Sequence, residues 1–333
     1  MLSLANRERV TPLWALQLKR HGLLDRAPKD LQDYLLELLQ ANRERNRAML
    51  AAMDEMAQRL TTAGSTVIAL KGGAALTDDL YGDIGARILG DIDLLIDPDL
   101  LPETPGLLKQ LGYLWDPEQE RIWRSLPQAA SRHFPRAHLP GTPVAVELHY
   151  RLLSRQGDLW NTDELFAAAI PSPLPHIRLL CPETRLAHNV IHALTSELAW
   201  ARSHLELRDL AEFAWLWRRD RPTAATGQML RGRSLALPAH CYARLAADLF
   251  RLDLPDAMTR GTRTRHLARF LARLEGQLHP LRARLNLALR YLPWLWRNHR
   301  LAVDGINNRQ RLGYLAHRLA QGATWRQVRE HWR

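Results

Sequence analysis

Three short runs of strand-forming residues interrupt a chain that is otherwise patterned for helices, and they restrict the fold more than any other feature. The runs cover residues 66–70, 91–96 and 143–149 and are rich in Val, Ile and Leu. Residues 102–111, between the second and third run, have the pattern of a helix that stops at Gly112. Strands mixed with short helices in this way predict a compact α/β or α+β unit.

Helical patterns flank this unit on both sides. Residues 28–60 contain no glycine or proline after Pro28, and Leu31, Leu35 and Leu38 recur at the spacing of one helix face. One long helix or a tight pair of helices is expected there, and the chain after Asn161 is expected to be helical to its end. These patterns divide the chain into an N-terminal helical segment (1–62), a mixed core (63–158) and a C-terminal helical domain (159–333).

Positive charge is concentrated near the C-terminus. The chain has 46 basic and 35 acidic residues, a net charge of +11, and 42 of the basic residues are arginine. Sixteen arginines and only three acidic residues follow Thr259, so the chain is basic from about residue 260. This segment could bind nucleic acid, an anionic membrane surface or an acidic partner, or it could form solvated helix faces.

The composition indicates a folded protein of the cytoplasm. With 46% hydrophobic and 24% charged residues, wholesale disorder and fibrous repeats are excluded. The two cysteines, Cys181 and Cys241, are too few for a disulfide framework, which is typical of a reducing compartment. No apolar run reaches the length of a transmembrane helix, and the N-terminus has no signal-peptide apolar region. A bacterial cytoplasmic location is therefore predicted.

The first strand run ends in a glycine pair. Gly72 and Gly73 follow Leu70-Lys71 and precede a short helical pattern. Glycines at a helix start allow backbone N–H groups to approach an anion, although the same pair is also typical of an ordinary turn. Lys71 could contact a phosphate at this place, or it could be a solvated lysine at a strand end.

Paired carboxylates mark the second and third runs. In a strand, Asp91 and Asp93 point to the same side, about 7 Å apart, and they repel each other unless a cation lies between them. A divalent metal is the usual cation, although an exposed edge strand would also tolerate the pair. Glu147 and His149 share one face of the third strand, so Glu147 is the candidate third carboxylate of a metal site. His149 could orient a ligand or be a structural histidine.

These motifs carry a resemblance to a known family. Leu-Lys-Gly-Gly-Ala-Ala-Leu from Leu70, the stretch ending in Gly-Ala-Arg87, Gly-Asp-Ile-Asp-Leu-Leu-Ile from Gly90, and Glu-Leu-His-Tyr-Arg-Leu from Glu147 are the relevant strings. They resemble the bacterial uncharacterised nucleotidyltransferase family, within the superfamily typified by DNA polymerase β. The resemblance is specific over residues 66–155 and diffuse to about residue 220. It departs from much of the superfamily in having Gly-Gly for Gly-Ser and Glu for the third Asp.

The resemblance implies a fold and a reaction. The fold is an α+β, polymerase β-like core, a small mixed sheet with flanking helices, here between N-terminal helices and a large C-terminal helical region. The reaction is transfer of a nucleoside monophosphate from a nucleoside triphosphate such as ATP to an acceptor hydroxyl, with release of pyrophosphate. Two Mg²⁺ ions, or Mn²⁺ in their place, would assist it. By position, the resemblance implies that both ions bind Asp91 and Asp93, and that the catalytic ion also binds Glu147. It also implies that the triphosphate contacts Gly72 and Gly73. Lys71 and Arg87 are further candidates for contacts with the triphosphate.

Other polar residues have alternative roles. Arg87 could instead pair with a catalytic carboxylate. His188 and His192 are four apart on an expected helix, a spacing that suits a metal pair, but without a third ligand we favour helix packing. Arg208 and Asp209 are expected to form structural ion pairs.

The acceptor stays open. A protein side chain, a small molecule, a polysaccharide precursor and an RNA end are all compatible with the sequence. Two other functions are alternatives: a catalytically silent nucleotide-binding or regulatory protein, and an RNA- or membrane-docking protein that uses the basic C-terminal helices.

Overall fold

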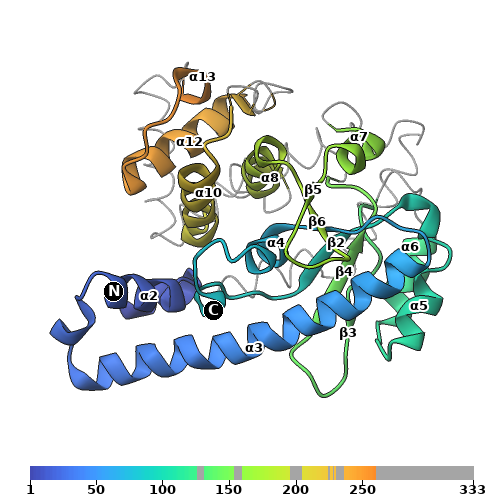
Figure 1. Ribbon diagram of the computed structural model, residues 1–333, viewed down its shortest axis with the longest axis horizontal. Coiled ribbons are helices and arrows are strands. Elements are labelled where there is room, and N and C mark those ends of the chain that lie inside the picture. The colour runs from blue at the N-terminus through green and yellow to red at the C-terminus, as the bar shows by residue number, and fades with distance from the viewer. Residues whose placement is uncertain are drawn as a thin grey trace, which may run out of the picture.

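The computed structural model describes residues 1–125, 131–153, 160–195, 205–223, 226–227, 229 and 236–259. Within these ranges the chain forms a mixed α+β structure in which helices flank one sheet (Figure 1). The predicted fold class is therefore confirmed. The basic segment from Arg260, and with it the anionic partner expected there, lies outside the described residues.

The sheet has six strands in the order β3-β4-β2-β1-β6-β5. Strand β2 lies at its centre, parallel to β4 and antiparallel to β1, and β1 is parallel to β6. The outer strands β3 and β5 are antiparallel to their neighbours. The strands are β1 (Ile68–Ala69), β2 (Ile92–Leu95), β3 (Ala137–His138), β4 (Ala145–His149), β5 (Ile170–Pro171) and β6 (Arg178–Leu179).

The three predicted strand runs form β1, β2 and β4. The prediction that the chain is helical throughout after Asn161 is wrong. Strands β5 and β6 lie beyond that residue, and each has two residues, too few to show a period of two. Pairing with β1 holds β6 in place, since the Arg178 N–H donates to the Val67 carbonyl at 2.8 Å. The sheet thus contains strands from both sides of residue 158.

The N-terminal part consists of α1 (Leu2–Arg7), α2 (Thr11–Arg20) and one long helix, α3 (Lys29–Thr62), which runs along the sheet in Figure 1. Of the two alternatives for residues 28–60, the single helix is correct. Its second half buries Met49, Met53 and Leu60 in the core formed by the sheet residues Ile92 and Leu94. Helix α3 is therefore part of the mixed core.

Two buried asparagines of α3 hold the loop that leads into β2. Asn42 Nδ2 donates to the carbonyls of Gly85 and Arg87 at 2.7 and 2.9 Å, and Asn46 Nδ2 donates to Arg87 O at 2.8 Å. Buried amides need such partners, so these bonds fix the loop around the 3₁₀-helix η2 (Ile84–Ala86). The start of β2 is positioned in this way.

The C-terminal helices α8 (Pro182–Thr195), α10 (Leu207–Asp220) and α12 (Ala236–Phe250) group together on one side of the molecule (Figure 1). Phe213 and Tyr242 are fully buried between them, with ring centroids 5.8 Å apart. The remaining helices are η1 (Leu24–Arg26), α4 (Lys71–Thr77), η3 (Pro98–Leu100), α5 (Thr104–Gln110), α6 (Pro117–Ser125), α7 (Thr162–Ala167) and α13 (Asp256–Thr259). In the described part of the chain, no helix has the length and apolar character needed to cross a membrane.

A buried ion pair joins α10 to the loop before β2. Arg87 Nε donates to Glu212 Oε2 at 2.9 Å, and the two side chains are 8% and 6% exposed. Burial alone would lower the pKa of Arg87, but the Glu212 carboxylate outweighs it and raises that pKa. Arg87 therefore stays charged inside the protein.

We predict that Glu212→Gln destabilises the fold by about 3 kcal/mol, because it leaves the buried Arg87 charge without its counter-ion. Urea unfolding measures this change. The matched control is Asp248→Asn, whose partner Arg244 lies 3.0 Å away in a pair that is 45–52% exposed. Equal midpoints for both variants would contradict the role given to Glu212.

Candidate active site

The register of two parallel strands brings two acidic residues side by side. Asp93 in β2 is the direct partner of Glu147 in β4. Because side chains of directly paired residues lie on the same face of a sheet, the two carboxylates point to the same side. His149 follows Glu147 at strand spacing and shares that face.

Asp93 is a buried carboxylate with two nitrogen partners. Its side chain is 5% exposed, and its Oδ1 lies 2.6 Å from Lys71 Nζ and 2.8 Å from His149 Nε2. Burial would raise the pKa of Asp93, but Lys71 and His149 outweigh it and hold that pKa well below its ordinary value. Asp93 is therefore ionised at neutral pH.

Lys71 opens helix α4 in a conformation that is rare for its type. Its φ of +48° lies in the left-handed region, which costs an L-residue about 1 kcal/mol or more. The Asp93 ion pair offsets this cost. With its side chain 22% exposed and paired, Lys71 is not the solvated strand-end lysine that was one of the two expectations.

Glu147 faces two histidines. Its Oε2 lies 3.6 Å from His149 Nε2 and 3.7 Å from His133 Nε2. Burial would raise the pKa of Glu147, but His149 and His133 outweigh it and lower that pKa to about 2. Burial, followed by the neighbouring His149, lowers the pKa of His133 to about 4.

His133 is the residue that the sequence analysis missed. It comes next to β4 through an isolated bridge with His149, and the two ring centroids are 5.0 Å apart. No strand alternation or ligand spacing marks the run from Ser131 to Phe134. No sequence signal singles His133 out among the 14 histidines.

Asp91 lies at the rim of the group. It precedes β2, its side chain is 31% exposed, and its Oδ2 is 3.5 Å from Arg136 Nε. Burial, followed by the charges of Asp93 and Glu147, raises the pKa of the Asp91 carboxyl. Asp91 is thus the carboxylate of the three whose charge is least compensated.

The donor set fits a divalent cation. Each of Asp93, Glu147 and His149 offers a ligand atom, and these three atoms lie within 4.8 Å of one another. Carboxylate oxygens and imidazole nitrogens are common ligands of divalent metals. Asp91 is not one of this compact group, although its pKa shows that it lies in the field of the other two carboxylates.

The glycine pair lies in the first turn of α4 and is buried. A Cβ on Gly72 would come within 3.0 Å of Leu89, and one on Gly73 within 3.4 Å of Met53 Sδ. The glycines therefore allow close packing of α4. The first bond of the helix starts at the Ala74 N–H, so the N–H groups before it lie outside the helical ladder.

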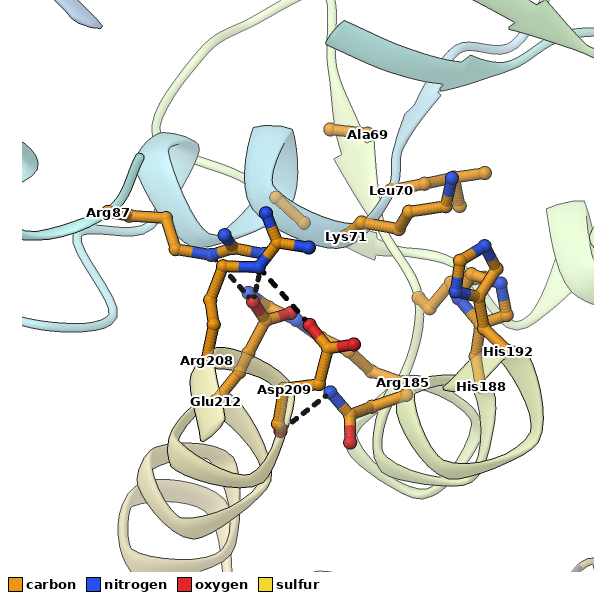
Figure 2. A pocket seen from close by; sticks show the side chains of 13 residues that line it. Ala69, Leu70, Lys71, Arg87, Arg185, His188, His192, Arg208, Asp209 and Glu212 are labelled. Atoms are coloured by element: carbon orange, nitrogen blue, oxygen red, sulfur yellow. Dashed lines mark hydrogen bonds and ion pairs between the residues drawn. The ribbon is translucent and has the colours of Figure 1, made fainter. Parts of the chain in front are cut away.

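A polar pocket of about 60 Å³ lies beside Lys71, between α4, α8 and α10 (Figure 2). Arg87 also lines it, and its guanidinium points to Glu212 (Figure 2). The other polar side chains of the lining come from α8 and α10: Arg185, His188, Asn189, His192, Arg208 and Asp209.

The two α8 histidines pack against each other in this pocket. The ring centroids of His188 and His192 are 5.6 Å apart, and burial lowers the pKa of His188 to about 3. Within the described ranges, no third Asp, Glu, His or Cys joins them in a metal-sized group. Arg208 lies 2.8 Å from Glu206 and 3.4 Å from Asp209, as expected for structural ion pairs.

Comparison with known proteins identifies one family. The sequence model of the family described as "Uncharacterised nucleotidyltransferase" matches residues 1–251. The match extends beyond residues 66–155, where the resemblance is strongest. No curated protein and no solved structure matches the chain.

Ionisation of Glu147 should make the free energy of unfolding fall as the pH is lowered. A folded-state pKa of about 2 lies below the ordinary value of 4.5, so its contribution to stability is present above about pH 4.5 and is lost as pH falls toward 2. In metal-free buffer, urea unfolding should show the wild type losing about 2 kcal/mol more than Glu147→Gln between pH 5 and pH 3. Parallel losses in both proteins would contradict the assignment.

Ionisation of Asp91 should lower the free energy of unfolding, whereas ionisation of Glu147 raises it. Because its pKa is raised, the ionised form opposes folding at neutral pH, so Asp91→Asn should raise the melting midpoint of the metal-free protein by about 2 °C. Asp99→Asn, at an exposed position eight residues further along the chain in η3, is the control and should leave the midpoint unchanged. A lower midpoint for Asp91→Asn would show that Arg136 compensates Asp91 fully.

Proposed function

Because the chain belongs to the uncharacterised nucleotidyltransferase family, we propose that it transfers a nucleoside monophosphate from a nucleoside triphosphate to an acceptor hydroxyl, with release of pyrophosphate. The observation that carries this proposal is the pairing of Asp93 with Glu147 on adjacent parallel strands. Both carboxylates have lowered pKa values and stay ionised at neutral pH. Ionised carboxylates held together in this way are what metal-assisted phosphoryl chemistry requires.

Asp91, Asp93 and Glu147 would hold the divalent cations, Mg²⁺ or Mn²⁺ by resemblance to the superfamily. When bound, these ions neutralise charge on the triphosphate and acidify the acceptor hydroxyl. The chain itself supplies the negative charge that attracts them. Asp91 contributes most of the uncompensated negative charge, because the charge of Asp93 is already compensated by Lys71 and His149.

The first turn of α4 would bind the triphosphate. The N–H groups of Gly72 and Gly73 are candidates for the β- and γ-phosphates, because helix N-termini favour negative charge. Lys71 bridges the two parts of the site: its ammonium lies on Asp93, and a cation at Asp93 would free it for a phosphate oxygen. Arg87, held by Glu212, would act as a positioning residue for the loop before β2.

The polar pocket beside Lys71 is the candidate place for part of the acceptor. It adjoins the Asp93 partner directly, and its lining offers imidazole, guanidinium and carboxylate groups from two helices.

The test is nucleotidyl transfer itself. With Mg²⁺ or Mn²⁺ and each α-labelled nucleoside triphosphate, the full-length protein should release pyrophosphate or label an acceptor from a cell extract. Asp93→Asn should lower the rate by about a thousand-fold, because it removes an ionised ligand while keeping the side-chain shape.

Asp99→Asn is the matched control, with the same chemical change at an exposed position. Circular dichroism and the melting midpoint show whether Asp93→Asn remains folded. If the wild type binds nucleotide with metal but transfers nothing to any extract, the silent nucleotide-binding alternative replaces this proposal. If neither nucleotide nor metal raises its melting midpoint, the site assignment is wrong as well.

A further inference from the structure

One nitrogen of His133 is already used by the backbone. Its Nδ1 lies 2.8 Å from the carbonyl oxygen of Phe134. A carbonyl oxygen only accepts hydrogen bonds, so Nδ1 carries the hydrogen of this contact. The nitrogen left for other chemistry is Nε2.

That second nitrogen points at a carboxylate. His133 Nε2 lies 3.7 Å from Glu147 Oε2, which is too long for a direct hydrogen bond. Two atoms that are each about 2.1 Å from one metal ion are at most about 4.2 Å apart, so the observed separation leaves room for a shared ion.

Further ligands are within reach of the same oxygen. His149 Nε2 lies 3.6 Å from Glu147 Oε2, and the ligand atoms of Asp93, Glu147 and His149 lie within 4.8 Å of one another. The His133 side chain is 26% exposed, so an ion can reach it from solvent. A fixed Nδ1–H bond to a carbonyl is also the usual way in which a protein orients a metal-binding histidine.

We propose that His133 Nε2 and Glu147 Oε2 share one divalent cation, which makes this part of the site a mixed imidazole–carboxylate site for a first-row transition metal of the Zn²⁺ or Co²⁺ class. The inference rests on the proposed function only for its location in the active site. It assigns a ligand and a metal preference that three carboxylates alone would not give. Mg²⁺ prefers oxygen ligands and loses its water reluctantly, whereas imidazole suits later transition metals.

The experiment uses metal-stripped full-length protein and Co²⁺ as the probe. Co²⁺ titration, followed by visible d–d absorption and by calorimetry, should give binding about 100-fold tighter than Mg²⁺ in the wild type. His133→Gln should weaken Co²⁺ binding by about 10- to 100-fold and change the absorption, while Mg²⁺ binding stays the same. His138→Gln, at an exposed histidine of β3, is the matched control and should behave as the wild type.

Two results would overturn the inference. Co²⁺ binding and absorption that do not change in a folded His133→Gln variant would show that the His133–Glu147 contact is an ordinary ion pair. X-ray absorption of the wild type loaded with Co²⁺ supplies a measurement that needs no variant: an oxygen-only shell without imidazole scattering also contradicts the proposal.

The nucleotidyl-transfer assay separates this inference from the proposed function. A protein that transfers nucleotide but shows no His133-dependent Co²⁺ site contradicts the metal assignment alone. A protein with that site but no transfer to any acceptor contradicts the proposed function alone.

Discussion

The rest of the site depends on the contacts of the buried, ionised Asp93 carboxylate with Lys71 and His149. A buried carboxylate costs several kcal/mol unless charged or hydrogen-bonding partners surround it. Its partners come from two other elements, Lys71 from the start of α4 and His149 from β4. The charge of one residue therefore fixes a helix and a strand relative to β2, and the left-handed backbone of Lys71 is a cost that this pairing offsets.

The surrounding helices stabilise the same region from two sides. From α3, Asn42 and Asn46 bind the backbone carbonyls of the loop before β2, and from α10 Glu212 binds Arg87 in that loop. Each contact buries polar groups that need their partners, so the loop has little freedom. The N-terminal and C-terminal helices thus form one support for the strand that carries Asp93.

The sequence predicts the part of this site that follows from local periodicity. Alternation along a strand predicts which face each side chain is on, so Asp93 and Glu147 could be recognised as candidate site residues. The glycine pair could be recognised because it follows a strand run and precedes a helical pattern. The Arg87–Glu212 pair joins residues 125 apart in the sequence, and no local pattern links them. His133 and the two-residue strands β5 and β6 are set by pairing with distant segments, which periodicity does not record.

Asp91, Asp93 and Glu147 also differ in how strongly each would attract a cation, because their negative charges are compensated to different degrees. Lys71 and His149 already compensate Asp93, so a cation there must displace an ammonium group. Asp91 has only Arg136 at 3.5 Å and a raised pKa, and Glu147 has imidazoles whose charge depends on protonation. Cations are therefore attracted more strongly at Asp91 and at Glu147 than at Asp93. The Lys71 ammonium, 2.6 Å from Asp93 Oδ1, keeps the Asp93 carboxylate ionised and leaves Asp91 and Glu147 as the carboxylates to which a cation can bind without displacing it.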